Sequence, residues 1–170
     1  SQATPLCINI TEKNLVTLKS LVYRTGLISR SPDEIIDILL GQATKCYIGG
    51  KEFTILEKND FGRCIRQLVP VETSTNFSRE EMEQFSNYFM TIFGCYEKIK
   101  FGKSTVDAKE LAVGFSVLCA GSKSVKLASG FDLLDKTRDG LIQQEQLSKY
   151  IRSYLTMLVG ISVLSSTPEK

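Results

Sequence analysis

Histidine and tryptophan are both absent from this chain of 170 residues. Histidine is the commonest general base near neutral pH and the usual partner of serine and cysteine nucleophiles. Its absence excludes His-assisted nucleophilic catalysis and His-ligated zinc sites. Catalysis would have to rely on carboxylates, lysine or a lone cysteine, and no grouping of such residues indicates an active site. We therefore predict that these residues do not form an enzyme.

The chain also lacks a strong excess of one charge and a long hydrophobic run. It has 21 basic and 19 acidic residues, and its formal net charge is +2. No run of Lys and Arg indicates a nucleic-acid surface, so we expect no nucleic acid among its partners. The longest uncharged apolar run, from Leu155 to Leu164, is too short to span a bilayer, so we expect no membrane span.

Paired cysteines are missing as well. The five cysteines are Cys7, Cys46, Cys64, Cys95 and Cys119. None of them forms a Cys-x-x-Cys pair, which excludes a zinc knuckle and a thioredoxin-like redox pair. An odd, scattered set is typical of reduced thiols, most of them small core residues. We therefore predict a cytoplasmic protein.

Helix start signals are frequent along the chain. Ser31-Pro32-Asp33-Glu34 combines an N-cap with a proline at the first helical position. Ser78-Arg79-Glu80-Glu81 is a capping box ahead of the most regular apolar stripe in the sequence. Thr11 and Asp107 begin two further predicted helices. These signals predict an all-α protein.

A polar segment divides this pattern into two halves. Thr73-Ser74-Thr75-Asn76 follows a proline and reads as a linker. We predict two lobes, residues 1–72 and residues 73–170, each long enough for a pair of helix–loop–helix units.

A segment from Asp135 to Gln146 has the spacing of a calcium-binding EF-hand loop. In such loops, positions 1, 3 and 5 supply side-chain oxygens, position 6 is glycine, position 7 gives a carbonyl oxygen, position 9 gives a further ligand and position 12 is a bidentate glutamate. The corresponding residues are Asp135, Thr137, Asp139, Gly140, Leu141, Gln143 and Gln146. Apolar helix faces on both sides complete a helix–loop–helix unit.

The identity of the last loop residue decides how well this segment could bind a metal. Neutral Gln146 stands where the glutamate belongs, which removes one charge and one ligand oxygen. We therefore predict a single weak calcium site. The alternative is a loop without metal, stabilised by Asx-type hydrogen bonds of its own side chains.

Two other segments have the position of such loops but not their ligands. Residues 97–110 end in Glu110, and Val106 stands where a ribbon-pairing residue belongs. Ile99, Phe101 and Lys103 occupy positions that should supply oxygen, so we expect packing rather than calcium to hold this loop. A fainter candidate runs from Tyr47 to about residue 61 and also lacks a ligand set. We predict that residues 1–72 contain a degenerate unit there.

A longer run of residues, between Leu111 and Ile142, supports the EF-hand interpretation. It comprises Leu111-Ala112-Val113-Gly114-Phe115-Ser116-Val117-Leu118-Cys119-Ala120-Gly121-Ser122, then Lys126-Leu127, Phe131, Leu134-Asp135 and Asp139-Gly140-Leu141-Ile142. This run resembles the central segment of neuronal calcium sensors, calcineurin B and calaxin-type proteins of the EF-hand (calmodulin) superfamily. The resemblance implies EF-hand pairs joined by short two-stranded loop ribbons. It also implies an apolar groove for an amphipathic helix of a protein partner.

The apolar faces of two predicted helices, at residues 82–96 and 107–119, supply candidate residues for this groove. They are Phe85, Phe89, Ile92, Phe93, Phe115 and Leu118. The alternative for each of them is ordinary core packing. The favoured function is a non-catalytic regulatory or scaffold module with calcium as a minor input. The alternatives are the calcium-sensing regulatory domain of a larger enzyme and a free-standing calcium sensor.

The third predicted unit has no partner unit within the chain. Ile142 occupies its ribbon position, and no fourth loop follows in the sequence. The apolar C-terminal tail, Leu155 to Leu164, is either the end of the last helix, a segment that folds into the protein's own groove, or a helix that pairs with another chain. We therefore predict either a homodimer that forms through the third unit or through this tail, or a parent protein that continues beyond this fragment and supplies the missing partner.

Overall fold

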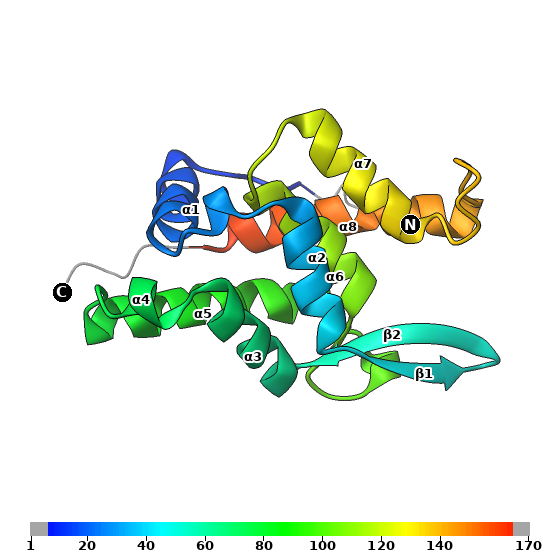
Figure 1. The fold of residues 1–170 in the computed structure, drawn as a ribbon, viewed down its shortest axis with the longest axis horizontal. Helices are drawn as coiled ribbons and strands as arrows, with labels where there is room; N and C mark the ends of the chain where they lie inside the picture. The colour runs from blue at the N-terminus through cyan, green and yellow to red at the C-terminus, as the bar shows by residue number, and fades with distance from the viewer. Residues whose placement is uncertain (1–6, 165–170) are drawn as a thin grey trace.

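Helices make up most of the chain in the computed structural model, which describes residues 7–164 (Figure 1). The helices are α1 (Glu12–Arg24), α2 (Pro32–Gly41), α3 (Lys58–Leu68), α4 (Val71–Ser74), α5 (Arg79–Tyr96), α6 (Ala108–Phe115), α7 (Lys123–Leu134) and α8 (Gln144–Ser162). Short 3-10 turns lie at η1 (Leu27–Ser29), η2 (Ile99–Phe101) and η3 (Ser116–Leu118). The prediction of a mainly helical protein is confirmed. Between residues 7 and 164, none of the helices is long and apolar enough to cross a membrane.

The helices begin where the local capping residues predict. Thr11 and Ser78 close capping boxes at the starts of α1 and α5, and each accepts a hydrogen bond from the third helical backbone N–H. Ser31 accepts from the backbone N–H of Glu34 at the start of α2. Asp107 accepts from two backbone N–H groups at the start of α6. Each cap satisfies donors that a helix N-terminus otherwise leaves unpaired.

A three-stranded antiparallel sheet corrects the all-α prediction. Its strands are β1 (Thr44–Ile48), β2 (Lys51–Glu57) and β3 (Thr105–Asp107), in the order β1-β2-β3. Gly49 and Gly50 form the turn between β1 and β2, with φ of 57° and 78°. Two residues with positive φ suit the twist of a tight hairpin, and glycine reaches this conformation at little cost. The segment expected to form a degenerate loop is therefore mostly a β-hairpin.

The second half of β2 pairs with β3 and joins two helix–loop–helix units. Leu56 lies opposite Val106, so the segment between α2 and α3 is hydrogen-bonded to the segment between α5 and α6. Val106 is the residue predicted to pair in a ribbon. Ile142 lies in no strand of the described chain, so the loop between α7 and α8 has no ribbon partner there.

The hydrophobic core includes residues from both predicted halves. The ring of Phe61, in α3, stacks on that of Phe93, in α5, with centroids 4.9 Å apart, and meets Phe115 edge-on at 5.8 Å. Leu21 from α1 and Met157 from α8 are fully buried in the same core. Part of the predicted linker forms the one-turn helix α4. The division into two lobes at residue 72 stays a prediction.

Candidate functional site

Asp135 organises the first half of the 135–146 loop. It is the C-cap of α7, and its side chain turns into the loop. One carboxylate oxygen, Oδ2, accepts a hydrogen bond from the Gly140 N–H at 2.8 Å, and Oδ1 accepts from the Thr137 hydroxyl at 3.3 Å. Gly140 has φ of 79°, in the left-handed region that favours glycine. The side chain thereby holds the sharp turn that this loop type requires.

Asp139 stabilises the next turn of the loop. Its Oδ1 accepts a hydrogen bond from the Leu141 N–H at 2.9 Å. This bond, followed by the contact with Thr137, lowers the pKa of Asp139, so its carboxylate is ionised at neutral pH. Asp139 and Leu141 are exposed to solvent. The Asx-type hydrogen bond proposed for a loop without metal is therefore present at Asp139, whereas Asp135 accepts from a backbone N–H five residues on.

The second half of the loop already belongs to α8. Gln143 is the N-cap of that helix, and its side chain makes no capping bond. Gln146 lies in the first helical turn, and its Oε1 atom is buried without a hydrogen-bond partner among the described residues. That oxygen is an available acceptor at the twelfth loop position.

The oxygen ligands of this loop are of the types that bind a hard cation, but their total negative charge is low. Carboxylate, hydroxyl, amide and carbonyl oxygens are the ligands that calcium takes. Only Asp135 and Asp139 are anionic, and the exposed side chains of Lys136 and Arg138 adjoin them. Within residues 7–164 no cluster of three or more His, Cys, Asp or Glu side chains could hold a metal ion. Any calcium site here would be weak.

In the loop between α5 and α6, cationic side chains neutralise the buried carboxylates. Glu110 is 2% exposed, and its Oε2 lies 2.7 Å from the Lys98 ammonium. The Arg152 guanidinium binds its other oxygen, with Nε at 3.1 Å. Asp107, also 2% exposed, lies 2.6 Å from the ammonium of Lys149. Ion pairs, as well as packing, therefore hold this loop.

An apolar groove of about 350 Å³ lies between α3, α4 and α5. Two of the predicted partner-binding residues, Phe85 and Phe89, form part of its wall. The other four, Ile92, Phe93, Phe115 and Leu118, do not line it and are buried in the core. The structure therefore separates the predicted set into two wall residues and four core residues.

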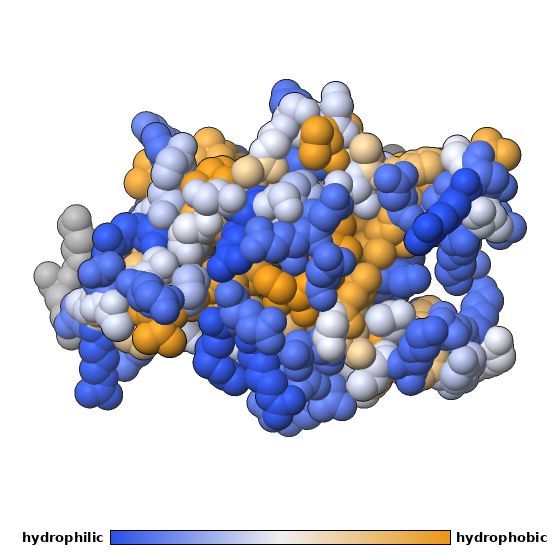
Figure 2. Space-filling view, in the orientation of Figure 1, coloured by the Kyte–Doolittle hydropathy of each residue, from blue (hydrophilic) through white to orange (hydrophobic). Residues whose placement is uncertain are grey.

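Most of the groove comes from residues that the sequence analysis did not select. They are Ile65, Val69, Val71, Phe77, Met82 and Met90. Met82 is 51% exposed and Val71 is 70% exposed, so the groove is open to solvent. Figure 2 shows apolar side chains at the surface near α4. The apolar face of α3, which carries Ile65 and is followed by the C-cap Val69, is the sequence signal that could have indicated this groove.

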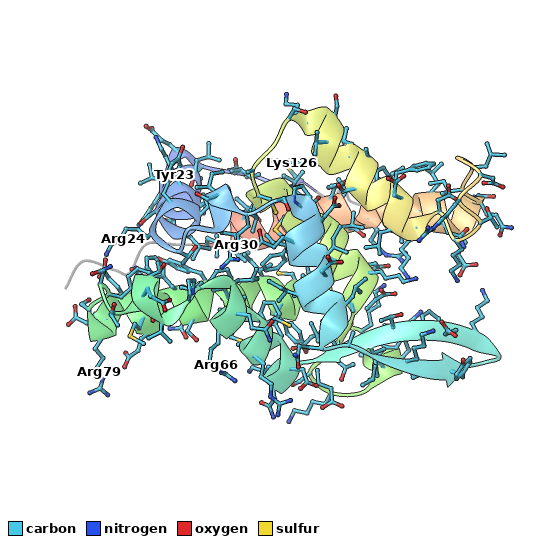
Figure 3. All side chains as sticks on the ribbon, in the orientation of Figure 1. Tyr23, Arg24, Arg30, Arg66, Arg79 and Lys126 are labelled. Carbon is cyan, nitrogen blue, oxygen red and sulfur yellow. The ribbon has the colours of Figure 1, made fainter. Side chains whose placement is uncertain are left out.

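Arginines flank the groove (Figure 3). The Arg24 guanidinium lies 5.3 Å from the centre of the Phe77 ring and 2.7 Å from the Glu81 carboxylate. Arg66 is part of the groove lining and is exposed. Within residues 7–164 it forms no ion pair. The rim of the groove therefore carries one unpaired positive charge, on Arg66, whereas Glu81 neutralises Arg24.

The predicted C-terminal tail continues α8 and packs against its own chain. Met157, Ile161 and Leu164 are buried. The Asn14 side-chain amide, from α1, donates a hydrogen bond to the Leu164 carbonyl. The opposite side of α8 carries an exposed apolar stripe, made up of Leu147, Ile151, Leu155 and Leu158.

Comparisons with protein-family models, with curated proteins and with solved structures find no match to this chain.

Proposed function

We propose that this protein is a non-catalytic regulatory or scaffold module of EF-hand type that binds an amphipathic helix of a protein partner. The groove between α3, α4 and α5 carries this proposal. It is lined mainly by apolar side chains, opens to solvent, and belongs to the ribbon-joined helix–loop–helix pair. Helix-in-groove binding uses such a surface to bury one face of the incoming helix.

The groove rim favours an acidic partner helix. Arg66 is an exposed cation without an ion pair in the described part of the chain, and Arg24 lies nearby over Phe77. Because Arg24 is already paired with Glu81, an acidic side chain on the polar face of a bound helix would lie opposite Arg66, and such complementarity raises association rates and specificity. We therefore propose a partner helix with leucine-type anchors and flanking carboxylates.

Two designed peptides test this proposal. Both have leucines at helical spacing, and their polar positions carry glutamate in one and lysine in the other. We expect the glutamate peptide to bind more tightly in fluorescence anisotropy. Met82→Asp should weaken binding by roughly tenfold or more, because it places a charge in an apolar contact worth about 1.5–3 kcal/mol.

Leu15→Asp is the matched control for Met82→Asp. Leu15 is 53% exposed and occupies the same helical position in α1 that Met82 occupies in α5, but it does not line the groove. Its substitution should leave peptide binding unchanged. An equal loss in the two variants, or no binding of either peptide to the wild type, would refute the groove as the partner site.

A weak calcium site in the 135–146 loop is a second proposed role. It is supported by the preformed turn around Asp135 and by the available acceptor on Gln146. The ligands would be Asp135, Thr137, Asp139, the Leu141 carbonyl, Gln143 and Gln146. Calorimetric titration should then give saturable heat at millimolar calcium that Asp135→Ala abolishes. A titration without heat would leave a constitutive binding module and would remove both calcium-sensor alternatives, free-standing or as part of a larger enzyme.

We also propose that the protein is cytoplasmic and that two copies associate through the third helix–loop–helix unit. The exposed stripe on α8 and the unpaired loop residue Ile142 support it. Sedimentation equilibrium should report a dimer that Ile151→Asp converts to monomer. A wild-type protein that stays monomeric at high micromolar concentration would exclude this arrangement.

A further inference from the structure

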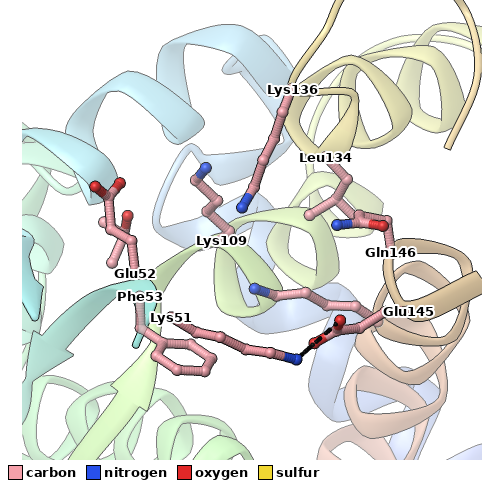
Figure 4. A pocket seen from close by; sticks show the side chains of 10 residues that line it. Lys51, Glu52, Phe53, Lys109, Leu134, Lys136, Glu145 and Gln146 are labelled. Atoms are coloured by element: carbon pink, nitrogen blue, oxygen red, sulfur yellow. Dashed lines mark hydrogen bonds and ion pairs between the residues drawn. The ribbon is translucent and has the colours of Figure 1, made fainter. Parts of the chain in front are cut away.

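Four lysines line a pocket (Figure 4), beside the β1–β2 hairpin, which lies at the other end of the molecule from α4 in Figure 1. The pocket has a volume of about 250 Å³. It lies between the β1–β2 hairpin, the start of α6, the 135–146 loop and the start of α8. The charged side chains that line it are Lys51, Glu52, Lys109, Lys136, Glu145 and Lys149.

The two glutamates of the pocket already have cationic partners. Glu145 lies 3.1 Å from the ammonium of Lys51, an ion pair that connects α8 to the tip of the hairpin. Glu52 lies 3.4 Å from the ammonium of Lys45 and accepts a hydrogen bond from the Tyr47 hydroxyl at 2.9 Å. Neither carboxylate forms an ion pair with the remaining lysines.

Two of the lysines lack a counter-charge. Lys149 is paired with the buried carboxylate of Asp107. Lys109 and Lys136 form no ion pair with any residue between 7 and 164. Figure 4 shows Lys136 reaching from its loop toward Lys109. The pocket therefore has two ammonium groups that no neighbouring carboxylate neutralises.

These ammonium groups repel one another at a partly desolvated position. Lys109 is half-buried, and burial lowers its pKa, with further lowering by the charges of Lys136 and Lys149. Asp107 and Glu52 oppose this effect without cancelling it. An anion bound between the ammonium groups would replace the repulsion by attraction.

The start of α8 adds a second source of positive potential. This long helix has no side-chain capping bond at its N-terminus, and its first-turn residues Glu145 and Gln146 line the pocket. Backbone N–H groups at a helix start carry partial positive charge and are common anion ligands. The uncapped helix start and the unpaired lysines therefore favour the same kind of ligand.

We propose that this pocket binds the phosphate group of a phosphomonoester. Two unpaired ammonium groups call for a compact dianion. A phosphate monoester carries about 1.5–2 negative charges near neutral pH and three acceptor oxygens, whereas a carboxylate carries one charge. Lysine binds phosphate as a point charge.

The organic part of the ligand would extend into a neighbouring hollow. This second hollow has a volume of about 650 Å³ and shares Phe53, Glu145 and Lys149 with the pocket. Lys100, which forms no ion pair within residues 7–164, adds positive charge to it, whereas Arg152 is already paired with Glu110. Its open, polar lining suits a hydrophilic body such as a sugar or polyol rather than an acyl chain.

Binding of inorganic phosphate and of glycerol phosphate tests this proposal. Calorimetric titrations at constant ionic strength, with glycerol as the uncharged reference, should give saturable binding to the wild-type protein. Lys109→Met combined with Lys136→Met should raise the dissociation constant by roughly tenfold or more, because two charged contacts are lost. Lys136 is exposed, so Lys136→Met alone keeps the fold and should still weaken binding.

A control with equal loss of charge separates this site from general attraction of anions. Lys13 and Lys123 are exposed and lie outside the pocket. Lys13→Met combined with Lys123→Met should leave phosphate binding unchanged. An equal loss in the two double variants would overturn the proposal.

A vesicle-binding assay distinguishes a phosphate group on a lipid headgroup from one on a soluble molecule. Phosphatidylcholine vesicles with a minor fraction of phosphatidylinositol phosphate are sedimented with the protein. Lysine-dependent binding to vesicles alone identifies a lipid headgroup, whereas lysine-dependent binding to the soluble phosphates identifies a free phosphomonoester. No binding in any arm overturns the proposal, and a failed peptide test of the groove would not affect it.

Discussion

Replacing Glu110 by glutamine tests whether ion pairs hold the loop between α5 and α6. The carboxylate is buried and contacts both the Lys98 ammonium and the Arg152 guanidinium. Breaking a buried pair by removing one partner costs about 3–5 kcal/mol, because the remaining charge loses its counter-charge. The side chains of Lys98 and Arg152 are 23% and 52% exposed, so water can compensate in part. We therefore expect a loss of about 2–3 kcal/mol in the free energy of unfolding.

Urea denaturation measures this loss. The transition midpoint should fall with an unchanged slope, and the melting temperature should fall by roughly 4–12 °C. Glu110→Gln combined with Lys98→Met should cost less than the sum of the single changes, because the second substitution removes the cation that the first leaves without a partner. Glu110→Leu combined with Lys98→Met and Arg152→Leu should recover stability for the same reason.

An exposed ion pair supplies the matched control. Glu83 lies 3.3 Å from Arg79, and these side chains are 66% and 93% exposed. Glu83→Gln should change the free energy of unfolding by less than about 0.5 kcal/mol. If Glu110→Gln costs as little as this control, or if its effect adds simply to that of Lys98→Met, the ion-pair account of the loop is wrong.

Two further predictions follow from the close packing of the core. Gly114→Ala should destabilise the protein by about 2–4 kcal/mol in the same urea assay. A Cβ atom there would lie 1.9 Å from the Tyr96 hydroxyl, which donates a hydrogen bond to the Ser153 carbonyl at 2.5 Å. Gly94→Ala, in α5 with open space around it, should be neutral or slightly stabilising, and a similar loss at both positions would contradict the packing argument. In a thiol-reagent assay near pH 8, Cys64 and Cys119 should react only as the protein unfolds, because burial raises their pKa values to about 11 and about 12. The exposed Cys7 should react at once, and fast labelling of all thiols in the folded protein would show that Cys64 and Cys119 are not shielded.

Local chemistry explains which elements were predictable from the sequence. The caps at Thr11, Ser31 and Ser78 involve residues three positions apart, so the sequence contains both members of each interaction. The β1–β2 hairpin was equally local but was missed. Its two central glycines, Gly49 and Gly50, lie between β-prone residues and are a known hairpin signal. The spacing between the flanking helices instead predicted a degenerate loop at these residues.

The candidate sites were only partly predictable. The 135–146 loop lies within one stretch of sequence, and the hydrogen bonds at Asp135 and Asp139 follow from residues two to five positions away. The groove required knowledge of which face of α5 turns inward. Phe85 and Phe89 reach the groove, whereas Phe93, on the same helix, is wholly buried against α3. Periodicity identifies an apolar face but does not say what covers it.

By itself, the sequence determined the helical character of this protein, most of its helix starts and the form of the 135–146 loop, because these depend on groups a few residues apart. The tertiary structure alone decided the pairing of the buried charges. Arg152 lies 42 residues from the Glu110 carboxylate that it neutralises. Lys109 and Lys136 line the same pocket, and neither forms an ion pair within residues 7–164. Charges far apart in the chain acquire partners or remain unpaired only when folding brings them together, and the unpaired ones are the basis of the proposed phosphate site.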